Sequence, residues 1–198
     1  MSDFPPQDIN AFLRLCAGEW LTVRSRFHLG GQVPAGSEPG RQAMAPEPGP
    51  PGPFVETETA AEDAQEHWHD SARGALVVTY SEAGNPEDPG ALLVTPPAID
   101  GPMLPSQKLV FATDGSFERQ AQPTGSVSQG RWQLWSDGSL ELTLRHGTTC
   151  VRERIWFTKP NLRLRSTVEN GADGSPSRAS FCSEIRRVSR PAPPAAAP

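Results

Sequence analysis

The sequence has few cysteines, and none lies at the spacing of a metal-binding or redox pair. Cys16, Cys150 and Cys182 are far apart, and no Cys-X-X-Cys occurs. This spacing argues against a zinc site or a redox pair and favours three buried or partly buried thiols in a reducing compartment. His67 and His69 lie at strand spacing, but no third ligand is evident, so the sequence predicts no metal site.

Long apolar segments and the common catalytic motifs are also missing. No apolar run is long enough to cross a bilayer, and the start of the chain lacks the basic and apolar regions of a secretory signal. The net charge of -5 argues against non-specific binding to nucleic acid. No GxSxG, HExxH, P-loop or GxGxxG motif occurs. We therefore expect a protein that binds neither membranes nor nucleic acid.

Proline and glycine are abundant, and they are clustered. The chain has 22 prolines and 18 glycines. Residues 30–53 and 191–198 are rich in proline, glycine and alanine and have few large apolar side chains, a composition that supports neither a helix nor a strand ladder. We expect a disordered insertion at residues 30–53 and a disordered tail at residues 191–198. The remainder of residues 1–190 is expected to form a single domain.

The other segments predict one helix followed by many short strands. Residues 8–17 carry apolar side chains at helical spacing, with Asp8 as the N-cap. Alternation and turn residues predict strands at residues 19–29, 73–81, 91–96 and 107–112, three strands within 130–157, and two more at 161–168 and 180–187. This order favours an antiparallel β-barrel or sandwich. A closed barrel of about eight or more strands can hold a small ligand.

The last two predicted strands carry a concentration of charge. Alternation places Arg163 and Arg165 on one face of the first strand, and Glu184 and Arg186 on one face of the second. A hairpin would bring these faces side by side, either as an exposed charge ladder or as a cavity wall whose arginines bind carboxylates. Alternation does not decide whether the charged face points to solvent or into a cavity, and composition alone favours exposure of the charges.

The strand at residues 19–29 poses the same question. Leu21, Val23 and Phe27 lie on one side, and Arg24 and Arg26 lie on the other. From this pattern we expect the apolar side to face the core and the two arginines to face solvent.

Three segments resemble a known family. Residues 153–168 (ERIWFTKPNLRLRSTV) and 179–187 (ASFCSEIRR) are similar to the C-terminal signature of the S/U-type phycobiliprotein chromophore lyases. Residues 17–29 (AGEWLTVRSRFHL), which follow the predicted helix, resemble the N-terminal signature of the same family. The matches occur in the family's order, which makes the resemblance specific.

The resemblance implies a fold, a reaction and partners. The fold is all-β, a lipocalin-like (fatty-acid-binding-protein-like) antiparallel barrel with an N-terminal helix. The substrate is a phycobilin, phycocyanobilin or phycoerythrobilin, which is bound noncovalently and attached by a thioether to a cysteine of a phycobiliprotein subunit, with the β subunit as the expected acceptor. No metal or prosthetic group is implied. The family contains homodimers and heterodimers of paralogous lyases, and its cyanobacterial members are cytoplasmic.

The resemblance also implies roles for charged residues. Arg163, Glu184 and Glu153 match positions expected to act in catalysis, and Arg24 and Arg165 match arginines expected to bind the bilin propionates with Arg163. The carboxylates would accept hydrogen bonds from the ring nitrogens or protonate the bilin. Under this reading the charged face of the last two strands points into the barrel, which reverses the expectation from composition.

Aromatic and apolar residues complete the predicted site. Trp68 resembles the aromatic residue that the family places against the bilin, and Tyr80 is the candidate for a second one. Leu162, Leu164 and Ile185 are expected on the outer face of the barrel. Two alternatives stay open, namely a non-catalytic bilin or lipid carrier of the same fold and a partner subunit of another lyase.

Overall fold

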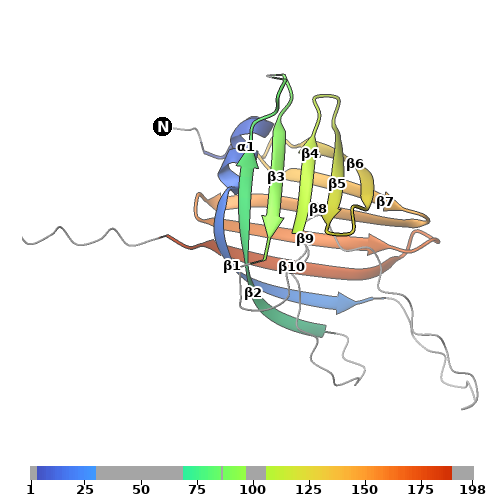
Figure 1. The fold of residues 1–198 in the computed structure, drawn as a ribbon. Coiled ribbons are helices and arrows are strands. Elements are labelled where there is room, and N and C mark those ends of the chain that lie inside the picture. Colours follow the sequence, from blue (N-terminus) through green and yellow to red (C-terminus); the bar gives the residue numbers. More distant parts are fainter. Residues whose placement is uncertain (1–3, 30–68, 86, 97–105, 189–198) are drawn as a thin grey trace, which may run out of the picture.

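The computed structural model describes residues 4–29, 69–85, 87–96 and 106–188 (Figure 1). The insertion predicted at residues 30–53, the tail predicted at 191–198 and the predicted site residue Trp68 lie outside the described residues. His67 also lies outside them, whereas the predicted helix, the predicted strands and the other predicted site residues fall on segments that the structure describes.

Ten antiparallel strands of the described residues form a closed barrel, which confirms the predicted fold class. Each strand pairs with its neighbours in sequence, and β1 closes the barrel by pairing with both β2 and β10. The elements are α1 (Ile9–Cys16), β1 (Gly18–His28), β2 (His69–Ser81), β3 (Gly90–Thr95), β4 (Ser106–Phe111), β5 (Ser116–Gln122), β6 (Val127–Leu134), β7 (Leu140–His146), β8 (Thr149–Lys159), β9 (Leu162–Asn170) and β10 (Pro176–Arg186). Figure 1 shows β3, β4 and β5 upright in front of β8, β9 and β10, which cross behind them.

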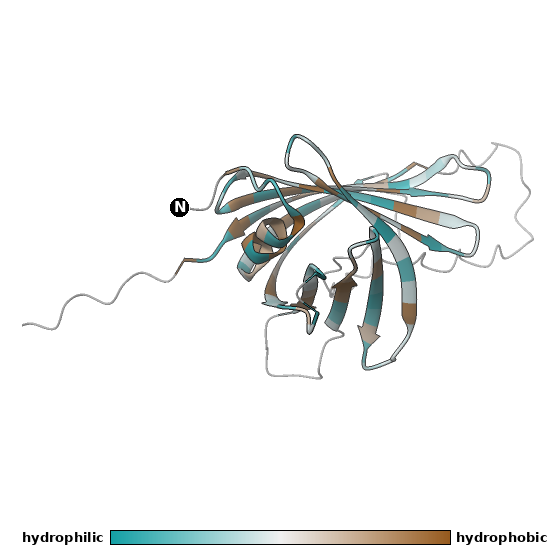
Figure 2. Cartoon of the chain, turned by 90° about the horizontal axis from the view of Figure 1, so that it is seen from above, coloured by the Kyte–Doolittle hydropathy of each residue, from teal (hydrophilic) through white to brown (hydrophobic). Residues whose placement is uncertain are grey.

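The single helix of the described chain packs into one end of the barrel. It begins at the predicted N-cap, where the Asp8 carboxylate accepts a hydrogen bond from the Ala11 amide at 2.7 Å. Its buried face carries Phe12, Leu13 and Cys16 at the predicted helical spacing. Viewed from above, the helix lies between the two walls of the barrel (Figure 2). With 8 residues, it is also too short to cross a membrane.

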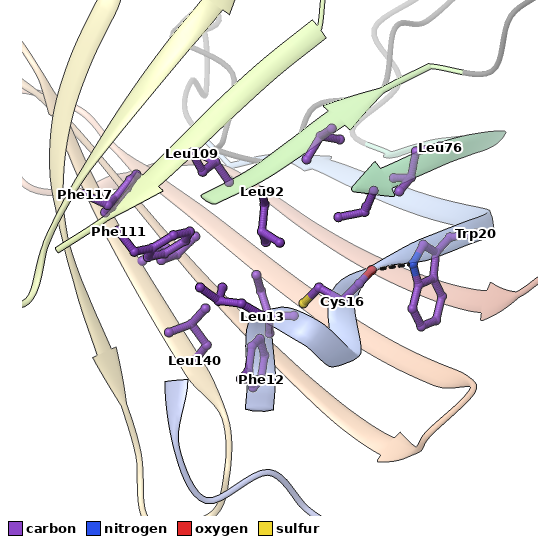
Figure 3. Packing of buried hydrophobic residues seen from close by; sticks show 14 of the residues in the cluster. Phe12, Leu13, Cys16, Trp20, Leu76, Leu92, Leu109, Phe111, Phe117 and Leu140 are labelled. Carbon is purple, nitrogen blue, oxygen red and sulfur yellow. Dashed lines mark hydrogen bonds between the residues drawn. The ribbon is translucent and has the colours of Figure 1, made fainter. Parts of the chain in front are cut away.

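The buried face of α1 joins a hydrophobic cluster inside the barrel. Phe12 and Leu13 belong to the same buried cluster as Leu92, Phe111 and Leu140, which Figure 3 shows from close by. Burial of a side chain of this size stabilises the fold by about 1.5–3 kcal/mol relative to exposure. The helix is therefore part of the core at this end of the barrel.

The face of β1 that points into the barrel is the one that we expected to face solvent. Trp20, Thr22 and Arg24 are buried, whereas Leu21 and Val23 are 53% and 47% exposed. The expectation that Arg24 faces solvent is therefore wrong. The inward face can carry an arginine because the interior also contains carboxylates that offset its charge.

The outer face of β1 continues an apolar surface onto β10. Leu21 pairs with Ile185, and Ser25 pairs with Phe181. Ile185 is 57% exposed and Phe181 is 42% exposed. The predicted outward orientation of Ile185 is thus observed.

Candidate functional site

The hairpin of β9 and β10 points its charged face into the barrel. Glu184 lies opposite Arg163 in the strand register, and Cys182 lies opposite Arg165. Arg163, Arg165 and Glu184 are 1%, 2% and 0% exposed. The exposed charge ladder favoured by composition is therefore wrong, and the inward orientation expected from the resemblance is observed.

Two arginines bind the carboxylate of Glu184. Arg163 donates from Nε to Oε2, and Arg165 donates from Nη2 to Oε1 at 2.7 Å. Burial acts to raise the pKa of Glu184, but the two guanidinium groups outweigh it and hold the pKa below its ordinary value of 4.5. Glu184 is therefore an anion at neutral pH.

Glu153, on β8, has a different environment although it lies in the same interior. Its Oε2 accepts a hydrogen bond from the Thr167 hydroxyl at 3.2 Å, while its Oε1 is 3.9 Å from Nη1 of Arg165. Burial raises the pKa of Glu153 above its ordinary value of 4.5, and the charges of Arg165 and Arg24 only partly offset this effect. The pKa values of the two carboxyl groups are thus shifted in opposite directions, and Glu153 is better able to hold a proton than Glu184.

Trp20 connects the charged interior to the end of α1. The guanidinium carbon of Arg163 lies 4.5 Å from the centre of the Trp20 ring, and that of Arg186 lies 4.3 Å from it. The indole nitrogen donates to the carbonyl of Cys16 at 2.9 Å (Figure 3). Sequence reasoning gave Trp20 no role. Alternation along β1 places its large aromatic side chain on the other face of the strand from Leu21, and this is the signal that could have found it.

Arg186 binds the carboxyl end of the helix. Its Nη2 donates to the carbonyl of Leu15 at 2.5 Å, and its Nη1 donates to the carbonyl of Ala17. These bonds satisfy carbonyls that the helix leaves without an intrahelical partner. Arg186 therefore positions the helix rather than extending the buried charge cluster.

Arg24 also contributes to the interior of the barrel. It lies on β1 opposite Cys182 of β10, and its charge lowers the pKa of both Glu153 and Glu184. The Cys182 thiol is buried and lies 3.9 Å from Oε1 of Glu184. Cys16 is also buried, and burial raises the pKa of its thiol.

Of the two aromatic residues predicted for the site, the structure describes Tyr80. Tyr80 is half-buried near the helix, where its hydroxyl donates to the carbonyl of Pro89 at 3.1 Å and its ring lies 5.7 Å from the guanidinium carbon of Arg14. It packs against the hydrophobic cluster. Trp68 lies outside the described residues. A ligand-binding role for either residue remains a prediction.

Sequence reasoning missed two inward-facing polar residues on the opposite side of the barrel. Gln107 of β4 and Arg119 of β5 are each 7% exposed. Gln107 shares its face of β4 with the buried residue Leu109, and Arg119 shares its face of β5 with the buried residue Phe117. The alternation in the strand predicted at residues 107–112 places Gln107 on the same face as Leu109, whereas the predicted strands do not include the segment of β5.

The buried charges of the described residues have an excess of positive charge. Four arginines are buried against two glutamates, an excess of two. They are Arg24, Arg119, Arg163, Arg165, Glu153 and Glu184. Among these same described residues, no group of three or more histidine, cysteine or acidic side chains could hold a metal ion. The arrangement suits an anionic organic ligand with two carboxylates.

Comparison with known proteins identifies the family. The chain is 32% identical over 188 residues to chromophore lyase CpcS/CpeS 1 of Paulinella chromatophora, a match that covers 94% of this chain and 92% of the relative. The chain belongs to the CpcS/CpeS chromophore lyase family. It is also 33% identical over 182 residues to chromophore lyase CpcS/CpeS 2 of Synechococcus sp. (strain JA-3-3Ab), covering 90% of this chain and 89% of that protein. A family model described as CpeS-like protein matches residues 117–187.

The fold agrees with a solved structure from the same family. The S-type phycobiliprotein lyase CPES from Guillardia theta superposes with a TM-score of 0.55 at 17% sequence identity, covering 92% of this chain and 94% of that chain. The family membership expected from three short segments is thus confirmed over most of the chain. The CpeS-like match at residues 117–187 contains both interior glutamates and three of the buried arginines.

Proposed function

We propose that this protein is a phycobiliprotein lyase that binds a phycobilin noncovalently in its barrel and catalyses attachment of the bilin to a cysteine of a phycobiliprotein subunit. The bond formed is a thioether. The acceptor thiol belongs to the partner subunit, and the β subunit is the proposed acceptor. The bilin is a substrate, and the reaction is proposed to take place in the cytoplasm.

The excess of buried arginines over buried glutamates carries this proposal. Among the described residues the excess of positive charge is two when both glutamates are ionised and three when Glu153 holds a proton, and the two propionate carboxylates of an open-chain tetrapyrrole would offset two of these charges. Arg165 and Arg24 are the proposed propionate ligands, together with Arg163, because guanidinium groups form paired hydrogen bonds with carboxylates. A neutral lipid lacks this match, because it has no carboxylate to form charge-assisted hydrogen bonds with the buried guanidinium groups.

The two glutamates supply distinct chemistry. Glu184, held as an anion, is suited to accept hydrogen bonds from pyrrole N–H groups and to stabilise positive charge on the bilin. Glu153, whose pKa is raised by burial, is suited to hold the proton that the bilin receives. Addition of a thiol across the ethylidene double bond forms the C–S bond, places one proton on the bilin and releases the thiol proton, so Glu153 can be reprotonated.

The thiols of this chain are not proposed as acceptors. Cys16 and Cys182 are buried, and burial raises the pKa of the Cys16 thiol. A thiol on the acceptor subunit must therefore approach from outside the barrel.

Co-expression with a bilin pathway and a panel of apo-phycobiliproteins tests the function. The wild-type protein is expected to produce a fluorescent subunit with a covalently bound bilin. Arg163→Ala and Glu184→Gln are expected to weaken bilin binding or transfer. Full binding and transfer by both variants would contradict the residue assignment.

The same experiment separates the alternatives. A carrier would bind bilin and change its absorption spectrum without changing the yield or stereochemistry of the thioether adduct. A partner subunit would bind no bilin alone and would become active when mixed with a paralogous lyase. Both outcomes would contradict lyase activity of the chain by itself.

A further inference from the structure

We propose that Gln107 and Arg119 form a second polar contact site for the bilin, on the wall of the barrel built by β4 and β5. Arg119 binds one propionate carboxylate, and Gln107 accepts a hydrogen bond from a neighbouring N–H group of the tetrapyrrole. This inference rests on the proposed function. It assigns binding residues on β4 and β5, outside residues 17–29, 153–168 and 179–187, the segments by which the sequence resembles the family.

The strand register places the two side chains on one inner surface. In the pairing of β4 with β5, Leu109 lies opposite Arg119 and Gln107 lies opposite Ala121. Gln107 and Arg119 are therefore diagonal neighbours on the same face, within reach of long side chains. Both point inward, since each lies two residues along its strand from a buried apolar residue, Leu109 for Gln107 and Phe117 for Arg119, and so shares its face.

Gln107 provides a direct sign of a missing partner. Its side chain is 93% buried, because only 7% of its surface is exposed, and its Oε1 has no hydrogen-bond partner among the described residues. A buried amide oxygen without a partner costs about 1–3 kcal/mol. A pyrrole or lactam N–H group of a bound bilin would satisfy this acceptor.

Arg119 provides the charge beside it. Burial lowers the pKa of Arg119, and the carboxyl group of Glu153 partly offsets this effect. Arg119 is 7% exposed and shares its face of β5 with the buried residue Phe117, so it faces the interior of the barrel, as the buried residue Glu153 does. A propionate bound by Arg119 would therefore lie on the β5 side of the barrel, away from Glu184, which already takes hydrogen bonds from Arg163 and Arg165.

Matched variants and two ligands test the assignment. The wild-type protein and its variants are titrated with phycocyanobilin and with phycocyanobilin dimethyl ester, whose propionates carry no charge. Arg119→Ala is expected to weaken binding of the free acid by at least about tenfold and to change binding of the ester little, since a charge-assisted hydrogen bond is lost only for the acid. Gln107→Leu is expected to weaken both ligands, and Gln107→Glu, which keeps the acceptor oxygen, is expected to restore binding of the ester.

Outward-facing residues of the same strands serve as controls. Lys108 and Gln120 lie opposite each other on the outer face of β4 and β5, so Lys108→Ala and Gln120→Leu are expected to bind both ligands as the wild type does. Equal weakening of acid and ester by Arg119→Ala, or no weakening of either, would overturn the role of Arg119. Weak ester binding by Gln107→Glu, equal to that of Gln107→Leu, would overturn the role of Gln107. Failure of the wild-type protein to bind either bilin would instead contradict the proposed function itself.

Discussion

Arg165 donates from Nη2 to Oε1 of Glu184 at 2.7 Å, and both side chains are buried inside the barrel. Arg163 binds the other oxygen of the same carboxylate. One glutamate therefore holds two arginines in an interior that also contains apolar side chains. Removal of the carboxylate would leave both guanidinium charges without their main partner, so the same residues matter for stability and for ligand binding.

Glu184→Gln is expected to lower the free energy of unfolding by about 3 kcal/mol, because it leaves buried guanidinium charges uncompensated. Urea denaturation followed by circular dichroism measures the change. Glu82→Gln is the matched control, since Glu82 forms an ion pair with Arg14 at 2.8 Å on the surface, where both side chains are mostly exposed. Its loss is expected to change stability little. Equal stabilities of Glu184→Gln and Glu82→Gln would contradict a buried ion-pair cluster.

Glu153 and Glu184 are expected to affect the pH dependence of folding stability in opposite directions, Glu184 below pH 4.5 and Glu153 above it. The folded pKa of Glu184 is below 4.5, so its contribution to stability is present above pH 4.5 and is lost as the pH falls through the folded pKa. The folded pKa of Glu153 is above 4.5, so its contribution is complete below pH 4.5 and is lost as the pH rises through the folded pKa. Glu153→Gln should therefore remove a decline in stability above pH 4.5. Urea denaturation at a series of pH values measures it, and an unchanged decline in the variant would count against the raised pKa.

Trp20→Phe is expected to destabilise the fold by about 2 kcal/mol, because it leaves the buried carbonyl of Cys16 without its donor and removes the indole ring beside two guanidinium groups. Trp135→Phe is the control, because Trp135 is 40% exposed. Thermal unfolding compares the two variants. If they unfold at the same temperature, Trp20 does not couple the helix to the charged interior.

Gly18→Ala is expected to loosen the contact between α1 and β10. Gly18 has a φ of 143°, and an added Cβ would lie 2.4 Å from Nη1 of Arg186. Arg186 would have to leave the carbonyls at the end of the helix. We expect a loss of at least about 1 kcal/mol, measured by urea denaturation. Gly84→Ala should have little effect, since nothing lies within 4 Å of an added Cβ there. Equal stability of the two alanine variants would contradict the helix-positioning role of Arg186.

The sequence predicts most of the elements, although not β5, because their signals are local. The N-cap Asp8 and the apolar spacing that follows it predicted a helix within one residue of its observed ends. Alternation and glycine-containing turns likewise predicted the hairpin of β9 and β10.

Alternation was not sufficient to predict which face of a strand is buried. Leu21 and Val23 favoured the wrong face of β1, since nothing local shows that Arg24 shares an interior with Glu153 and Glu184. That information resides in contacts between residues far apart in the chain. The family resemblance gave the correct face for β9 and β10 because it carries such long-range information indirectly.

Binding of phycocyanobilin by Arg165→Gln tests the central claim most directly, because the substitution removes one interior charge and leaves Arg163 bound to Glu184. Absorption titrations compare it with the wild type and with Arg145→Gln, which removes an arginine from the exposed end of β7. The account predicts that the wild type and Arg145→Gln bind equally, with a changed bilin spectrum, and that Arg165→Gln binds at least about tenfold more weakly. Equal affinity of all three proteins would contradict a bilin site built from the buried arginines.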